Sequence, residues 1–149
     1  MTAEAPTVHA SAVLTGARAV LIRGPAGAGK SRLALALIAA AQSGLIRFAR
    51  LIGDDRVHLE PAHQRLLVRP AATLTGLIEV RGLGIRRLDY EPVAAVGLVV
   101  DLAAPDAERL PEAAQTDVLG IALPRVAIAP GIDPLPPVLA ALTGIKAWS

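Results

Sequence analysis

The chain has 149 residues, enough for one domain spanning 1–149. Its core must consist of Ala, Val, Leu and Ile, because 53% of the residues are hydrophobic but only 2% are aromatic. It has no cysteine, which excludes disulfides, zinc–thiolate sites and thiol nucleophiles, while the few aromatic residues and the near balance of 15 basic against 13 acidic side chains do not favour a nucleic-acid partner. Because neither a signal-like N-terminus nor an apolar run of about 20 residues is present, we expect a cytoplasmic protein without a membrane partner.

The N-terminal half of the sequence predicts strands around one helix. Apolar runs at 8–14 and 19–23, separated by the turn signal Thr15-Gly16, are expected strands. The helix is expected over 31–42, is apolar nearly all round and therefore buried, and ends near Gly44. Short apolar runs follow at 51–53, 57–59 and 65–69, the last two joined by a turn at 61–64. Antiparallel strands so close to this helix indicate a mixed sheet.

The C-terminal half has less regular signals. Three glycines and four charges among the aliphatic residues of 76–87 are typical of a mobile surface loop. The run 95–101 is a strongly apolar expected strand, 105–119 is an expected polar helix with loops, and 126–128 is an expected short strand. Prolines begin a terminal helix over 136–143.

An octapeptide between the second strand and the first helix has the Walker A pattern GxxxxGK[ST]. It reads Gly24-Pro25-Ala26-Gly27-Ala28-Gly29-Lys30-Ser31. Glycines let the backbone curl so that N–H groups point at phosphate oxygens, and the positive end of the following helix faces the same charge. Lys30 is expected to reach the β and γ phosphates, and the Ser31 hydroxyl to bind Mg²⁺. A glycine-rich turn that binds nothing is the disfavoured alternative, since these residues rarely coincide with a strand before and a helix after them.

Phosphoryl transfer also needs carboxylates, and two places in the sequence offer them. Asp101 ends a buried apolar strand, as a Walker B acid does, although it also fits a helix N-cap or a turn. Asp54 and Asp55 follow a less regular run and also fit a solvated turn. Two adjacent carboxylates repel each other, so a shared cation favours such a pair. The pattern alone leaves the two places nearly equal.

Four motifs in order resemble the catalytic domain of the bacterial HPr kinase/phosphorylase family. They are His9-Ala10-Ser11-Ala12-Val13, the octapeptide at 24–31, Asp54-Asp55-Arg56-Val57, and Glu79-Val80-Arg81-Gly82-Leu83-Gly84-Ile85. Many families share the Walker A pattern, but the acidic pair and the glycine-rich motif at 79–85 are specific to this one. The resemblance covers most of the chain and favours the acidic pair over Asp101.

The resemblance implies a fold and a set of roles. The fold is an α/β domain with a P-loop and a mixed β-sheet, similar to phosphoenolpyruvate carboxykinase, and the reaction is ATP- and Mg²⁺-dependent phosphorylation of a serine on HPr or a related phosphocarrier. Asp55 is implied to accept the proton of the target serine. A carboxylate beside the γ-phosphate can accept a hydroxyl proton as the bond to phosphorus forms. The remaining implied roles are Lys30 on the phosphates, Ser31, Asp54 and Glu79 on the metal, and His9 within the active site. Family members assemble as hexamers.

The sequence also departs from the family pattern. The chain begins almost at the catalytic domain, so we expect no N-terminal domain, as in short alphaproteobacterial homologues linked to phosphotransferase regulation. The segment 89–96 lacks an arginine that full-length members carry, and Pro130-Gly131-Ile132-Asp133 replaces their Pro-Gly-Arg-Asn motif. Phosphorylase activity is therefore not expected, and loss of one transition-state arginine can slow transfer on the order of 10³-fold.

Two rival functions follow from these departures. One is an impaired ATP-binding regulatory protein, and the other is a small-molecule kinase. Arg81, Arg86 and Arg87 are expected to pair with phosphate or with an acidic partner, although solvated arginines are a comparable alternative. The remaining histidines, His58 and His63, match no motif and are expected to be structural or exposed.

Overall fold

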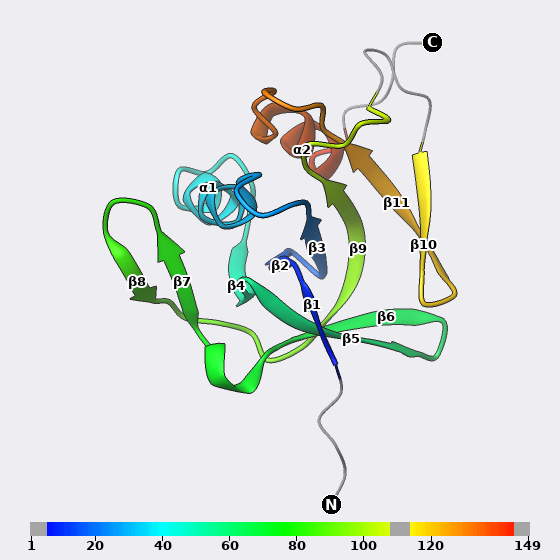
Figure 1. Cartoon of the computed structure of the whole chain (residues 1–149), viewed down its shortest axis with the longest axis horizontal. Helices are drawn as coiled ribbons and strands as arrows, with labels where there is room; N and C mark the ends of the chain where they lie inside the picture. The colour runs from blue at the N-terminus through cyan, green and yellow to red at the C-terminus, as the bar shows by residue number, and fades with distance from the viewer. Residues whose placement is uncertain (1–5, 108–113, 145–149) are drawn as a thin grey trace, which may run out of the picture.

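A curled, mixed, nine-stranded sheet with two helices on one side dominates the computed structural model, which describes residues 6–107 and 114–144 (Figure 1). The strands are β1 (Thr7–His9), β2 (Ser11–Thr15), β3 (Arg18–Arg23), β4 (Ala49–Gly53), β5 (Arg56–Ala62), β6 (Arg65–Pro70), β9 (Ala94–Asp101), β10 (Ala114–Val118) and β11 (Ile121–Ala127). The helices are α1 (Lys30–Gln42) and α2 (Leu135–Leu142), and a short 3₁₀ turn, η1, spans Ala72–Leu74. A separate two-stranded sheet consists of β7 (Leu77–Val80) and β8 (Gly84–Arg87).

The sheet runs in the order β1-β5-β6-β9-β3-β2-β4. Strand β6 pairs with the first residues of β9, β11 pairs with its last residues, and β10 pairs with β11. Strand β9 is parallel to β3 and β11 but antiparallel to β6, while the remaining neighbours are antiparallel. The predicted α/β class with a mixed sheet is therefore confirmed. The hairpin of β5 and β6 is confirmed as well, and His63 and Gln64 form its tight turn with positive φ angles of 51° and 65°.

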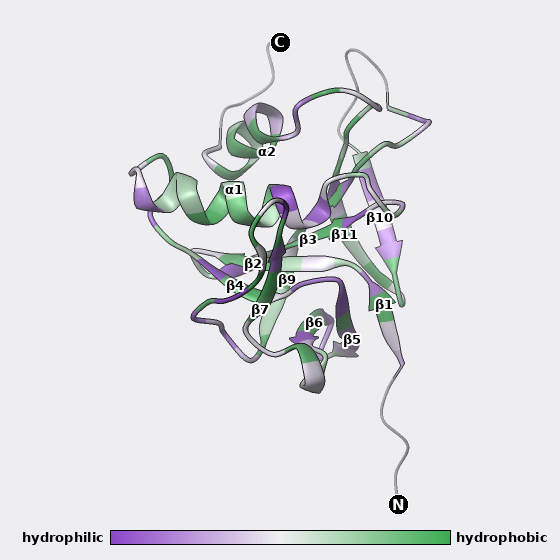
Figure 2. Cartoon of the chain, turned by 60° about the vertical axis from the view of Figure 1, so that its left-hand side comes forward, coloured by the Kyte–Doolittle hydropathy of each residue, from purple (hydrophilic) through white to green (hydrophobic). Residues whose placement is uncertain are grey.

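Two apolar cores lie on opposite faces of the sheet. Along β3 the side chains alternate, so that Val20 and Ile22 join the core under α1 while Ala19 and Leu21 join the core on the other face. Figure 2 shows α1 and α2 on the same side of the sheet. All buried hydrophobic residues in the described ranges are Ala, Val, Leu or Ile, as the composition predicts.

The loop between β3 and α1 has the conformation that its glycines permit. Gly27 and Gly29 have φ angles of 80° and 100°, which side chains with a Cβ rarely adopt. Gly24 packs against the segment after β9, where an added Cβ would lie 3.1 Å from the Leu102 Cβ. Strand, loop and helix thus follow one another as the sequence predicts. The helix is not buried all round as expected, because only Leu33, Ala34, Leu37 and Ala40 on one face are buried.

Three predicted elements need correction. The segment 76–87 is not an irregular loop, because it forms the β7–β8 hairpin, and Ile78 lies in the core under α1. Residues 114–118 form strand β10 where a polar helix was expected, since their side chains alternate between half-buried and exposed along the edge of the sheet. The rest of that expected helix includes 108–113, which lie outside the described residues. The expected strand over 8–14 divides into β1 and β2 at Ala10.

Candidate functional site

The loop 24–31 presents backbone N–H groups and one lysine at the start of α1. Gly29 is the N-cap of α1 and no side chain caps this end, so the N–H groups of the first turn face the loop. The Lys30 Nζ donates hydrogen bonds to the carbonyl oxygens of Gly24 at 2.7 Å and Pro25 at 3.2 Å. A helix start without a side-chain cap, a glycine loop and an ammonium group together form an arrangement that suits an anion such as phosphate.

Asp54 lies at the centre of the polar contacts beside this loop. Its side chain is buried, with the residue only 3% exposed. The Ser31 Oγ lies 2.7 Å and 2.8 Å from the two carboxylate oxygens of Asp54 and donates its single proton to that carboxylate. The Ser11 Oγ donates to Oδ1 at 2.6 Å. The structure thus brings Ser31 of the loop 24–31, called the phosphate loop below, together with Asp54, the first aspartate of the acidic pair.

Asp55 and His9 lie at the exposed rim of this cluster. Asp55 has a φ of 67°, an unusual left-handed conformation for a residue with a Cβ, and its side chain is exposed to solvent, unlike that of Asp54. The His9 Nδ1 is 3.9 Å from the Asp55 Oδ1, and their side chains are 63% and 65% exposed. At that distance the two groups attract each other only weakly, because the contact is longer than a hydrogen bond.

Glu79 reaches the cluster through its backbone. Its N–H group donates to the Asp54 Oδ2 at 3.3 Å, and its side chain lies on the exposed face of β7. This contact joins the β7–β8 hairpin to the acidic pair, and Figure 2 shows the hairpin rising beside the start of α1. The hairpin also carries Arg81, Arg86 and Arg87, all exposed.

Asp101 has different surroundings from Asp54. Arg23 donates to both of its oxygens, from Nε at 2.7 Å and from Nη2 at 2.9 Å, and the Arg125 Nε is a third donor. Arg125 also holds the exposed Asp106 with two hydrogen bonds. Burial is the largest single influence and raises the pKa of Asp101, but the two arginines together outweigh it and hold the pKa below its ordinary value. Asp101 therefore forms an ion-pair network across β3, β9 and β11.

The donor set of Asp54 and Ser31 fits a hard cation such as Mg²⁺. A buried carboxylate and a hydroxyl oxygen lie in contact at the start of the phosphate-loop helix. Across 6–107 and 114–144, no group of three or more His, Cys, Asp or Glu side chains could hold a metal ion. Protein sites for Mg²⁺ commonly use only one or two carboxylates together with phosphate oxygens and water. Asp54 and Ser31 would hold the ion, and Glu79, whose backbone N–H contacts Asp54, would bring a second carboxylate from β7.

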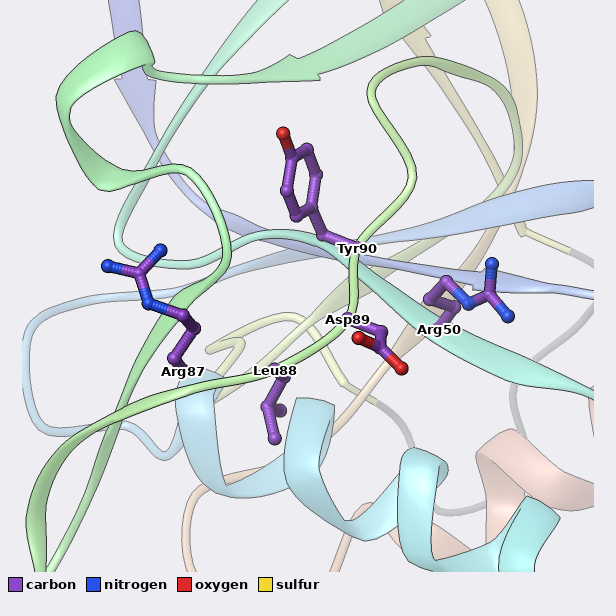
Figure 3. A pocket seen from close by; sticks show the side chains of 5 residues that line it. All are labelled: Arg50, Arg87, Leu88, Asp89 and Tyr90. Atoms are coloured by element: carbon purple, nitrogen blue, oxygen red, sulfur yellow. The ribbon is translucent and has the colours of Figure 1, made fainter.

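A hollow of about 560 Å³ lies between β4 and the segment 87–90, and none of its lining residues belongs to the loop 24–31. Its lining residues are Arg50, Arg87, Leu88, Asp89 and Tyr90. Figure 3 shows the two guanidinium groups on opposite sides of the 87–90 segment, with Tyr90 and Leu88 pointing in opposite directions. Arg50 is already paired with Glu91 at 2.7 Å. Because its polar groups do not converge, this hollow offers no binding chemistry to compare with the phosphate loop.

Sequence reasoning passed over Ser11 and Arg125. Ser11 is a fully buried polar residue in an apolar strand, and a polar residue at an inward strand position is a signal that it has a partner. Arg125 gives no such signal, because its partners Asp101 and Asp106 are 24 and 19 residues away.

Within the described ranges, no helix is long and apolar enough to cross a membrane.

Comparisons with known proteins find the same family by sequence and by structure. The family described as HPr Serine kinase C-terminal domain matches residues 1–131. The chain is 34% identical over 139 residues to the HPr kinase/phosphorylase of Geobacillus thermodenitrificans, covering 83% of this chain and 43% of that protein. It is 36% identical over 100 residues to the HPr kinase/phosphorylase of Lactobacillus delbrueckii subsp. bulgaricus, covering 66% of this chain and 29% of that protein.

A solved structure gives the same result for the fold. The Hpr(Ser) kinase/phosphatase from Coxiella burnetii superimposes with a TM-score of 0.74 at 27% sequence identity, covering 93% of this chain and 94% of that chain. The chain spans less than half the length of the curated relatives named above. Since the family match extends over 131 of the 149 residues and the fold agrees, the chain belongs to the HPr Serine kinase C-terminal domain family.

Proposed function

We propose that this protein is an ATP- and Mg²⁺-dependent serine protein kinase that phosphorylates HPr or a related phosphocarrier of a phosphotransferase system. One observation carries the proposal: Ser31, which follows the phosphate-loop lysine, shares a hydrogen bond with the buried carboxylate of Asp54. A hydroxyl and a carboxylate in contact at this position are the protein ligands that a nucleotide-bound Mg²⁺ uses in P-loop enzymes. The names of the relatives supply the class of substrate.

The residues would divide the reaction between binding and proton transfer. Lys30 would exchange its bonds to Gly24 and Pro25 for bonds to phosphate oxygens. When bound, Mg²⁺ would neutralise charge on those oxygens. The hydroxyl oxygen of the substrate serine would form the new bond to the γ-phosphorus while the bond from that phosphorus to ADP breaks. Asp55 would accept the proton that this hydroxyl loses. An exposed Asp55 carboxylate is accessible to a protein substrate, and His9 would lie beside it within the active site.

The exposed arginines Arg81, Arg86 and Arg87 would contact the phosphocarrier. They lie on the hairpin whose Glu79 N–H touches Asp54, so a partner bound there would be next to the phosphate loop. We propose further that residues 1–149 form one catalytic-type domain, which acts in the cytoplasm and assembles as an oligomer, a hexamer by family resemblance. Light scattering coupled to size-exclusion chromatography measures the subunit number directly.

A transfer assay tests the kinase proposal. The protein is mixed with ATP, Mg²⁺ and purified phosphocarriers of the source organism, and intact mass is measured. We expect one added phosphate on a serine, lost in Lys30→Ala and Asp55→Asn and reduced in the triple replacement of Arg81, Arg86 and Arg87 by Gln. The matched control is Asp117→Asn, because Asp117 only accepts a bond from Gly120 in the β10–β11 turn.

The same assay separates the rival functions. ATP binding that needs Lys30, without transfer to any protein, would favour an impaired ATP-binding regulatory protein. Turnover of a metabolite without a protein substrate would favour a small-molecule kinase. The missing family arginine makes slow transfer compatible with the proposal, so the assay runs to long times. Release of phosphate from phosphorylated carrier is not expected.

A further inference from the structure

The buried Ser11 hydroxyl links the two aspartates of the acidic pair. It donates to the Asp54 Oδ1 at 2.6 Å and accepts the backbone N–H of Asp55 at 3.4 Å. The residue is 0% exposed, so no water competes for these contacts. We propose that Ser11 is a positioning residue that fixes the Asp54 carboxylate for the metal ion and the Asp55 backbone for proton transfer. The inference rests on the proposed function for the roles of the two aspartates.

Strand register explains why Ser11 lies there. Strand β1 pairs with β5 at His9 and Arg56, whereas β2 pairs with β4 at Ala12 and Gly53. The break between β1 and β2 therefore faces the break between β4 and β5, which is the acidic pair itself. The Ala10 N–H donates to the Asp55 carbonyl at 3.2 Å and closes the same junction. Ser11, the first residue of β2, is therefore next to this junction, and its hydroxyl contacts both aspartates directly.

The contacts of Asp54 show what Ser11 contributes. Its Oδ1 accepts from Ser11 and its Oδ2 accepts from the Glu79 N–H, so each oxygen is held by one donor outside the phosphate loop. Ser31 lies against both oxygens. When Ser31 turns its oxygen toward a cation, Ser11 and Glu79 still fix the plane of the carboxylate. Without the Ser11 hydroxyl, Oδ1 would have no donor except Ser31 among the contacts present.

The test compares Ser11→Ala with Ser11→Thr, which keeps the hydroxyl. Affinity for a non-hydrolysable ATP analogue is measured by calorimetry with and without Mg²⁺, after circular dichroism and thermal unfolding have checked the fold. We expect Ser11→Ala to lower the gain in affinity from Mg²⁺ about tenfold, the size of a lost hydrogen bond to a charged group, with little change in the affinity without Mg²⁺. Ser11→Thr should recover most of that gain. Ser43→Ala, which loses a hydroxyl at the end of α1, should match the wild type.

Two results would overturn the inference. The first is an unchanged Mg²⁺ gain in Ser11→Ala, and the second is an equal loss with and without Mg²⁺, which means a purely structural role. Ser11→Cys has similar volume but a weak donor, and it provides the test if Ser11→Ala does not fold. Transfer to the phosphocarrier is measured separately. A Mg²⁺ gain that depends on Ser11 without any transfer would leave the positioning role intact and reject the kinase proposal.

Discussion

Asp54 and Asp101 show how much a carboxylate depends on its partners. Asp54 directly follows β4 and Asp101 is the last residue of β9, yet Asp54 is surrounded by hydroxyls and an N–H group while Asp101 is held between Arg23 and Arg125. A carboxylate already neutralised by two guanidinium groups has little to offer a cation. Sequence patterns gave the two nearly equal weight because those arginines are 78 and 24 residues from Asp101 along the chain.

The Asp101 network predicts a stability that depends on pH. The pKa of Asp101 is lower in the folded protein than in the unfolded chain, so its contribution is complete above the unfolded pKa of about 3.9 and disappears as the pH falls through the lower folded value. Asp101→Asn should cost roughly 2 kcal/mol of unfolding free energy at neutral pH. The difference from the wild type should shrink below about pH 4.

Urea unfolding at several pH values measures this difference, with Asp117→Asn, at an exposed residue of β10, as the control. A gap between wild type and Asp101→Asn that stays constant down to the lowest pH would contradict the ion-pair explanation.

At the scale of elements, the locally encoded parts were predictable and the parts fixed by distant contacts were not. The strand, loop and helix around 24–31 follow from glycines and apolar periodicity within a short segment, as does the β5–β6 hairpin. The β7–β8 hairpin was missed because glycines and charges in 76–87 hid the inward position of Ile78. Its placement depends on α1 and on Asp54, which no local pattern shows.

This hairpin predicts a clear contrast between two isoleucines. Ile78 is 1% exposed and lies in the core under α1, whereas Ile85 on the paired strand is 66% exposed. Ile78→Ala should destabilise the protein by about 2–4 kcal/mol, because it leaves a cavity in the core. Ile85→Ala should stay within about 0.5 kcal/mol of the wild type. Chemical denaturation of both variants measures these losses of unfolding free energy. Equal losses would contradict the position of Ile78 in the core and of Ile85 at the surface.

At the scale of the whole molecule, β9 joins two parts of the sheet. Its first residues pair with β6, its last residues pair with β11, and β3 lies along its other edge. Both apolar cores contain residues of β9, with Leu98 and Val100 on one face and Val96 and Val99 on the other. We therefore regard β9 as the strand on which the whole fold depends.

Hydrogen exchange measured by mass spectrometry should show this hierarchy. Amides of Val99 and Val100 should exchange only on global unfolding, because these residues are paired on both edges, with β3 and β11, and are buried. Amides of β8, whose four residues are all exposed, should exchange much earlier through local opening. Similar protection in the two segments would mean that the hairpin and the main sheet unfold together.

The contacts of Asp54 also have a consequence for the order of folding. Its partners Ser11, Ser31 and Glu79 are 43, 23 and 25 residues away along the chain, so the carboxylate gathers its donors only after three long loops have closed. The lysine contact with Gly24, in contrast, closes across six residues. A nascent chain can thus shape its phosphate loop early, while the proposed cation ligands come together only after β7, which carries Glu79, has joined them. If the proposed metal site exists, its formation would report that these four distant residues have come together.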